Sequence, residues 1–179
     1  MTWLIIGIAV LVLFAVYLSS TAGRLDRLHS RVDTAYGSLD VQLLRRSGAA
    51  LDVAGSGLLD PASTLLLGDA AISAREAQQE PIGRTQLESD LTKAIAVTIG
   101  SKEDVEVLVS EPLGAELVDA MSGSFHRAAL ARRFYNDAVR ACRSLRRQRI
   151  VRWFRLAGHT DWPQTVEMDD DIPPGFAGR

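Results

Sequence analysis

Hydrophobic and polar positions divide this chain into one continuous apolar run and a longer part in which apolar residues recur at helical spacing. The run extends from Trp3 to Leu18 without a charged side chain, and the first charged side chain of the sequence is Arg24. At about 1.5 Å per residue, a helix over residues 1–23 is roughly 30 Å long, which matches the hydrocarbon core of a bilayer. The run therefore predicts a transmembrane helix.

After this run, apolar residues fall three or four positions apart, a spacing that places them on one stripe of a helix. They are Leu25, Leu28, Val32, Ala35, Leu39 and Leu43. We therefore expect the membrane helix to continue without a break into the polar part of the chain. Gly48, Gly55 and Gly57 weaken it toward its end.

Turn residues divide the middle of the chain into further helices. Asp60-Pro61 supplies an N-cap followed by proline at the first position of a helix that ends near Gln78. Glu80-Pro81 then breaks the chain, and a third helix is expected over residues 83–99, before Gly100-Ser101.

Residues 102–110 fit two structures. Val105, Val107 and Val109 alternate as in a strand, whereas Ser101 followed by Asp104 is typical of a capped short helix. We favour the short helix, because a lone strand has no partner in this sequence.

From Leu113 the pattern predicts one long helix that ends near Ala157-Gly158. Short connections favour neighbouring helices that run antiparallel. The fold class is therefore all-α: a transmembrane helix over residues 1–23, a cytoplasmic antiparallel bundle of about four helices over 24–158, and a flexible acidic, Pro-rich tail over 159–179. Within the tail, residues 172–176 are either a short docking segment or a loose end.

A cleavable signal sequence is the alternative to a permanent anchor, since Ser20 and Ala22 have the spacing of a cleavage site. The absence of a basic residue before the apolar run favours an uncleaved anchor. Three arginines follow the run, at positions 24, 27 and 31. The positive-inside rule then predicts a single-pass protein of the cell membrane, with its N-terminus outside and its body in the cytoplasm.

Charge is distributed unevenly although the net charge is only −2. Ten arginines and one acid lie between residues 127 and 155, and the C-terminal part of this stretch combines the arginines with aromatic residues. The members of this predicted membrane-surface group are Arg143, Arg146, Arg147, Arg149, Arg152, Trp153, Phe154 and Arg155.

Three interpretations of this group remain open. Placed beside a bilayer, the arginines favour contact with anionic lipid and the tryptophan suits the headgroup layer. Alternatively, the arginines form a solvated face whose aliphatic stems cover the core. A nucleic-acid site is a third interpretation, but the sequence contains no recognised DNA- or RNA-reading motif, so no nucleic acid is expected as a partner.

The sequence contains none of the common catalytic motifs. It has no nucleophile elbow, no phosphate-binding glycine loop and no zinc-protease pair of histidines. Three scattered histidines give no metal-ligand spacing, and Asp169 to Asp171 lacks the alternating ligands of a calcium loop. Cys142 lies on the apolar stripe of the last helix, where it is a small buried residue unless exposure lets its arginine neighbours lower its pKa. We therefore expect neither enzymatic activity nor a cofactor nor a metal.

The first and last long helices are long enough to lie side by side. With Arg155 near Arg24, residues 134–140 would pack against residues 39–45. We expect Asp40 to meet Arg140 on this seam. The residues expected to form the interhelical motif are Asp40, Gln42, Arg45, Arg46, Arg133, Tyr135, Asn136, Asp137 and Arg140.

Asp137 has two possible sets of partners. It can meet Gln42, Arg45 or Arg46 across the seam, and we favour this arrangement. It can also pair within its own helix with Arg133, four residues earlier.

Two stretches of this sequence carry a family resemblance. Residues 24–46 include Arg24-Leu25, Val32-Asp33, Asp40-Val41-Gln42-Leu43 and Arg45-Arg46, and residues 131–140 read Ala-Arg-Arg-Phe-Tyr-Asn-Asp-Ala-Val-Arg. Together with the N-terminal membrane helix, they resemble the LemA family of bacterial membrane proteins. The chain departs from the family pattern at residues 47–51 and near Ile99-Gly100, so the resemblance is to a divergent member.

The resemblance implies a single-pass protein with its N-terminus outside, a cytoplasmic antiparallel helical bundle and no established enzymatic activity. The leading hypothesis is a non-enzymatic scaffold or adaptor for an unidentified membrane or cytoplasmic protein partner. The second hypothesis is a protein that binds or organises lipid through the basic end of the last helix. An enzyme is the third and least favoured.

Overall fold

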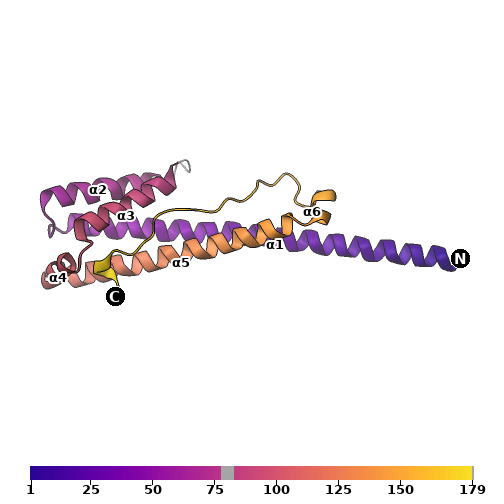
Figure 1. Cartoon of the computed structure of the whole chain (residues 1–179), viewed down its shortest axis with the longest axis horizontal. Helices are drawn as coiled ribbons and strands as arrows, with labels where there is room; N and C mark the ends of the chain where they lie inside the picture. Colours follow the sequence, from indigo (N-terminus) through magenta and orange to yellow (C-terminus); the bar gives the residue numbers. More distant parts are fainter. Residues whose placement is uncertain (78–82, 179) are drawn as a thin grey trace. The chain divides into compact units, whose positions relative to one another are not determined.

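The chain is entirely helical wherever its secondary structure is regular in the computed structural model, which describes residues 1–77 and 83–178. The helices are α1 (Thr2–Gly55), α2 (Pro61–Glu76), α3 (Arg84–Ile99), α4 (Lys102–Ser110), α5 (Gly114–Arg146) and α6 (Arg149–Trp153), followed by the 3-10 turn η1 (Pro174–Phe176) (Figure 1). The predicted all-α class is confirmed. The expected break at Glu80-Pro81 lies outside the described residues.

The helices form two compact units. Unit 1 consists of residues 1–36 and 134–165, and unit 2 of residues 37–133 and 166–179. Helices α1 and α5 each contribute to both units, so each unit is described separately.

Helix α1 runs unbroken from the apolar run into the polar part of the chain, as the periodicity predicts. It is long and apolar enough near the N-terminus to span a membrane, a property that signal sequences share. The apolar run itself is exposed, whereas the stripe after it is buried. The buried stripe residues are Leu25, Val32, Leu39, Leu43 and Ala50.

Local sequence explains how the middle helices begin. The carboxylate of Asp60 accepts hydrogen bonds from the backbone N–H groups of Ala62 (2.9 Å) and Ser63 (3.2 Å), and Pro61 occupies the first helical position. At α4, Ser101 and Asp104 form a reciprocal capping box, which resolves residues 102–110 as the helix rather than the strand.

The long C-terminal helix is shorter than the pattern predicts. Helix α5 ends at Arg146, and α6 begins at Arg149 after an extended Gln148. The break separates Arg146 from Arg149, which in a continuous helix would be like charges three residues apart, a pairing that is unfavourable by a few tenths of a kcal/mol. Ending α5 instead places Arg143 and Arg146 in its last turn, where the helix dipole favours cations.

The core of unit 2 is built mainly from small and medium side chains. Its buried members are Ala50, Val53, Ala54, Leu67, Ala71, Ala74, Leu91, Ile95, Ile99, Val105, Leu108, Val118, Met121, Phe125 and Phe176. Phe176 comes from the tail and is fully buried, with its ring centroid 5.7 Å from that of Phe125. Of the two possibilities left open for residues 172–176, the structure shows a segment that packs on its own chain.

A buried ion pair lies within unit 2. Nη2 of Arg46 donates to a carboxylate oxygen of Glu88 at 2.5 Å and to the backbone carbonyl of Glu88 at 2.8 Å, and both side chains are at most 2% exposed. Burial raises the pKa of the Glu88 carboxyl, an effect that the neighbouring Arg46 opposes. Nη1 of Arg46 also donates to the hydroxyl of Thr92.

Glu88→Gln is expected to lower the free energy of unfolding by about 3–5 kcal/mol, because it leaves the charge of Arg46 buried without a counter-ion. Thermal and denaturant unfolding of the detergent-solubilised chain, followed by helical circular dichroism, measures this loss. Lys93→Gln is the matched control, because it breaks the exposed Asp90–Lys93 pair and should cost less than about 1 kcal/mol. Equal losses in the two variants would contradict a structural role for the buried pair.

Candidate functional site

Three parts of the structure are candidates for function: a groove on the α2–α3 hairpin, the basic segment around α6, and the contacts that hold the tail. The first lies in unit 2 and the second in unit 1. The tail contacts lie partly in each unit.

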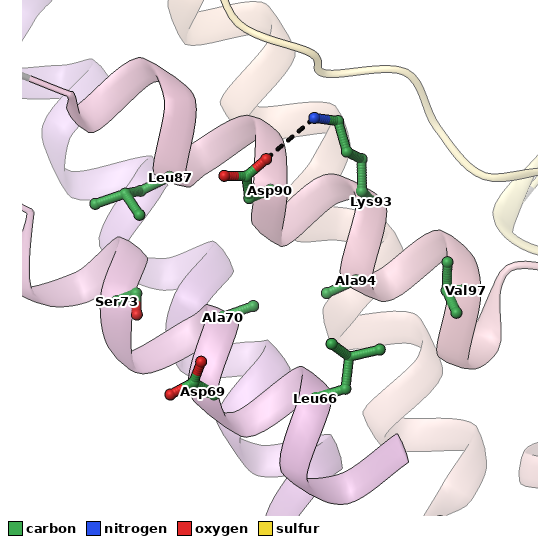
Figure 2. Close-up of a pocket in the computed structure, with 9 residues that line it drawn as sticks. All are labelled: Leu66, Asp69, Ala70, Ser73, Leu87, Asp90, Lys93, Ala94 and Val97. Carbon is green, nitrogen blue, oxygen red and sulfur yellow. Dashed lines mark hydrogen bonds and ion pairs between the residues drawn. The ribbon is translucent and has the colours of Figure 1, made fainter. Parts of the chain in front are cut away.

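The hairpin groove has a volume of about 410 Å³ and is formed between α2 and α3 (Figure 2). Its lining residues are Leu66, Asp69, Ala70, Ser73, Leu87, Asp90, Lys93, Ala94 and Val97. Leu66 is 47% and Val97 74% exposed, although both are large apolar side chains. Leu65 and Ile72 add exposed apolar area on α2, so this hairpin presents more apolar surface than its own packing uses.

Charged groups border the apolar floor of the groove. The carboxylate of Asp90 accepts hydrogen bonds from Nζ of Lys93 (3.0 Å) and from the amide of Gln86 (2.9 Å), and these bonds hold its pKa below the ordinary value. Asp69 lies exposed on the α2 side. The groove therefore offers an apolar floor with acidic oxygens on both of its walls.

The basic segment of unit 1 consists of residues 147–155. Trp153 is 82% and Phe154 47% exposed, and the four arginines of the segment, at positions 147, 149, 152 and 155, are also exposed. The ring of Phe154 lies edge-on to that of Phe14, with centroids 5.4 Å apart. This contact attaches the basic segment to the apolar run of α1.

Two of the arginines assigned to a membrane surface have another role. Arg143 donates to the carbonyl of Pro163 (2.6 Å) and to the side chain of Gln164 (2.7 Å). Arg146 donates to the carbonyls of Thr160 (2.8 Å) and Asp161 (2.5 Å). Its guanidinium also lies over the Trp162 ring, 4.9 Å from the ring centroid. Arg143 and Arg146 therefore bind the start of the tail, and their assignment to a membrane surface stays a prediction.

Tyr135 of the expected interhelical motif also binds the tail. Its ring lies 5.6 Å from that of Tyr36, and its hydroxyl donates to the carbonyl of Gln164 at 2.7 Å. Burial raises the pKa of Tyr135 above its ordinary value. Asn136 of the same motif is also buried.

The ion pairs of the expected motif differ from the predicted ones where the structure describes them. Asp40 accepts from Arg84 on α3 at 2.5 Å, and Asp137 accepts from Arg140 three residues later. The predicted contact of Asp137 with Arg46 joins different units and stays a prediction; within unit 2, Arg46 is buried against Glu88.

Other predicted contacts of the motif are not tested. The pair of Asp40 with Arg140 and the contacts of Asp137 with Gln42 or Arg45 join different units and stay predictions. Arg45 and Arg133 are exposed, and a buried oxygen of Gln42 accepts no hydrogen bond among the described residues.

Sequence reasoning missed the pairs that hold unit 2 together. Arg46–Glu88, Arg84–Asp40 and Arg132–Asp170 all join residues far apart in the chain. The sequence contained one signal for the first of these pairs. Glu88 is a charged residue on the apolar stripe of α3, one turn before Leu91 and Thr92.

Neither a protein-family model, nor the sequence of a curated protein, nor a solved structure matches this chain. The resemblance to the LemA family therefore stays an expectation from the residues that carry it. Among the described residues, no group of three or more histidine, cysteine, aspartate or glutamate side chains is arranged to hold a metal ion.

Cys142 is fully buried, and burial raises the pKa of its thiol, with nearby Arg146 opposing this effect. We expect its reaction with an aromatic disulfide reagent at pH 8 to be roughly a hundredfold slower in the folded chain than in denaturant, because labelling requires an opening that costs a few kcal/mol. The release of the coloured thiolate measures both rates. Equal rates would show that the thiol is accessible.

Proposed function

We propose that this chain is a non-enzymatic, membrane-anchored helical-bundle protein of the LemA type that acts as a scaffold or adaptor for a protein partner. In this proposal α1 spans the cell membrane once, with its N-terminus outside, and the other helices form an antiparallel bundle in the cytoplasm. The arginines that follow the apolar run support this orientation. The order of contacts in unit 1 supports antiparallel packing, because Tyr36, His29 and Phe14 of α1 meet Tyr135, Arg146 and Phe154 in turn.

The observation that carries the adaptor function is the hairpin groove. Exposed apolar patches often mark interaction sites, and this one lies on the α2–α3 hairpin of unit 2. Its shape, between two sixteen-residue helices, suits an amphipathic helix laid along it. Because Asp69 and Asp90 border the floor, the partner helix should combine an apolar face with flanking basic residues.

Photo-crosslinking in the native membrane tests the adaptor function. A photoreactive amino acid at Leu66 or Val97 should give one discrete adduct with a partner protein. With the photoreactive residue at Val97, the variant Leu66→Asp should reduce the adduct at least roughly tenfold, because a charge in the apolar floor opposes docking. The matched control is Val107 on α4, which is also apolar and 65% exposed but lies outside the groove. Identical adducts from Val107 and Val97, or none from the groove, would contradict the adaptor function.

A second candidate function is contact of the basic segment with anionic lipid. The specific observation is the contact between Phe154 and Phe14, because it places exposed arginines and Trp153 beside the apolar run of α1. If α1 spans the bilayer, Trp153 would lie at the headgroup layer. Each exposed arginine near an anionic surface would contribute roughly 1 kcal/mol.

A spin label at position 153 tests this second function in proteoliposomes of the full-length chain, with Cys142 replaced by Ser. In vesicles containing anionic lipid, the label should be more accessible to oxygen than to a water-soluble nickel complex. Arg149→Glu combined with Arg152→Glu should reverse this order, because both charges then repel the surface. A label at exposed His159 serves as the control site. A label at position 153 that remains water-accessible in anionic vesicles would exclude the lipid contact.

A further inference from the structure

The C-terminal segment of residues 169–176 occupies a site in unit 2 whose polar part recognises a carboxylate and a main chain. Nε and Nη2 of Arg132 donate to the two carboxylate oxygens of Asp170, each at 2.8 Å. The hydroxyl of Thr92 donates to the carbonyl of Asp169 at 2.8 Å, and the N–H of Asp169 donates to the hydroxyl of Ser89 at 3.0 Å. A two-pronged arginine–carboxylate contact is geometrically selective, so the site distinguishes an acid at this position.

The apolar part of the same site accepts a glycine followed by an aromatic residue. The N–H of Gly175 donates to the carbonyl of Gly100 at 2.8 Å. A Cβ at position 175 would lie 2.3 Å from the carbonyl oxygen of Ser101, so only glycine fits. Phe176 is fully buried beside Phe125. The segment is therefore held like a peptide ligand, by an acid, a main-chain clamp and an aromatic anchor.

The residues just before this segment lie at the surface. None of residues 166–168 is buried or belongs to a helix, and the carboxylate of Glu167, 76% exposed, lies 3.9 Å from the guanidinium of Arg132. The segment could therefore leave its site without removing any other element from the core. An identical segment from another molecule would restore every contact that is lost, which is the condition for low-cost exchange between copies.

We propose that this site, formed by Arg132, Ser89, Thr92, Gly100 and Phe125, also takes the C-terminal segment of a second copy of this chain. The proposal rests on the proposed membrane anchor. Copies anchored by the same helix have the same orientation in the membrane, so the site of one copy and the segment of the other lie at the same distance from the bilayer. Two copies then exchange segments about a twofold axis along the membrane normal. Confinement to the membrane raises the effective concentration of one segment at the other site.

A pair of charge-reversal variants of the full-length chain tests the exchange. In Arg132→Asp the site repels its own Asp170, and in Asp170→Arg the segment repels its own Arg132. When the two variants are mixed in proteoliposomes, each site faces a complementary segment only on the other variant. We expect energy transfer between labelled copies to show association roughly tenfold or more tighter in the mixture than in either variant alone.

The control is the double variant that carries both reversals in one chain, because it restores the complementary pair within each copy. It should fold and associate like the wild-type chain, so misfolding of a single variant does not obscure the result. Energy transfer in the mixture equal to the mean of the two separate variants would overturn the proposal.

A second comparison tests the wild-type sequence directly. Gly175→Ala should remove wild-type association, because the added Cβ excludes the segment from either copy's site, whereas Ala177→Ser at a neighbouring exposed position should leave it unchanged. Association that survives Gly175→Ala would also overturn the proposal. Flotation of the same vesicles distinguishes failure of the exchange from failure of the proposed function. Chains that float with the lipid but do not associate contradict the exchange alone, whereas chains that do not float contradict the membrane anchor.

Discussion

The buried pair of Arg46 and Glu88 is the constraint on which unit 2 depends. Two charges removed from water are tolerated only where their hydrogen bonds are largely satisfied, so the helices that carry them must meet in one alignment. Arg46 fixes α1 to α3 through Glu88 and Thr92, and its guanidinium lies over the ring of Phe125 on α5, 5.9 Å from the ring centroid. Three helices are thus aligned by one side chain.

This alignment bears on the register of the helices. Alanines at positions 50, 54, 71 and 74 lie in the core, and alanine side chains interdigitate little. A slip of one helix by a turn would leave Arg46 without its counter-ion. We therefore interpret the pair as a device that specifies register, a role for which buried polar groups are best attested. The second pair, Arg84 with Asp40, links the same two helices nearly two turns away on α1.

The tail depends on the same network. Thr92 accepts from Arg46 and donates to the carbonyl of Asp169, and Phe176 packs on the ring that Arg46 covers. The tail therefore covers the helices that the ion pair has aligned, and a misaligned α3 would present neither Thr92 nor Ser89 to it. In unit 1 the start of the tail is held differently, by arginine and tyrosine donors that bind main-chain carbonyls.

Sequence patterns gave the helices but not the contacts of the tail, and the reason is physical. The stripe of α1, the Asp60 cap and the Ser101 capping box are local signals, and each predicts a structure within a few residues of itself. Except for the bond from Arg143 to the side chain of Gln164, the bonds from Arg143, Arg146 and Tyr135 end on backbone carbonyls, which every residue carries, so no side-chain pattern marks them. The end of α5 at Arg146 was missed for a related reason: apolar spacing continues through Ile150 and Trp153, and no glycine or proline marks the stop.

Ion pairs and hydrogen bonds within the chain also determine which charged side chains are available to a lipid or a protein partner. Arg46, Arg84, Arg132, Arg143 and Arg146 each bind a group of this chain, so a tally of basic residues overstates the charge that can meet lipid. The arginines of residues 147–155 are exposed, and the same segment contains the exposed Trp153 and Phe154. The hairpin groove, by contrast, carries acids and belongs to the other unit. Because the two surfaces differ in charge and share no residue, the proposed lipid contact would not use the side chains of the groove, so the two proposed functions are chemically compatible in one chain.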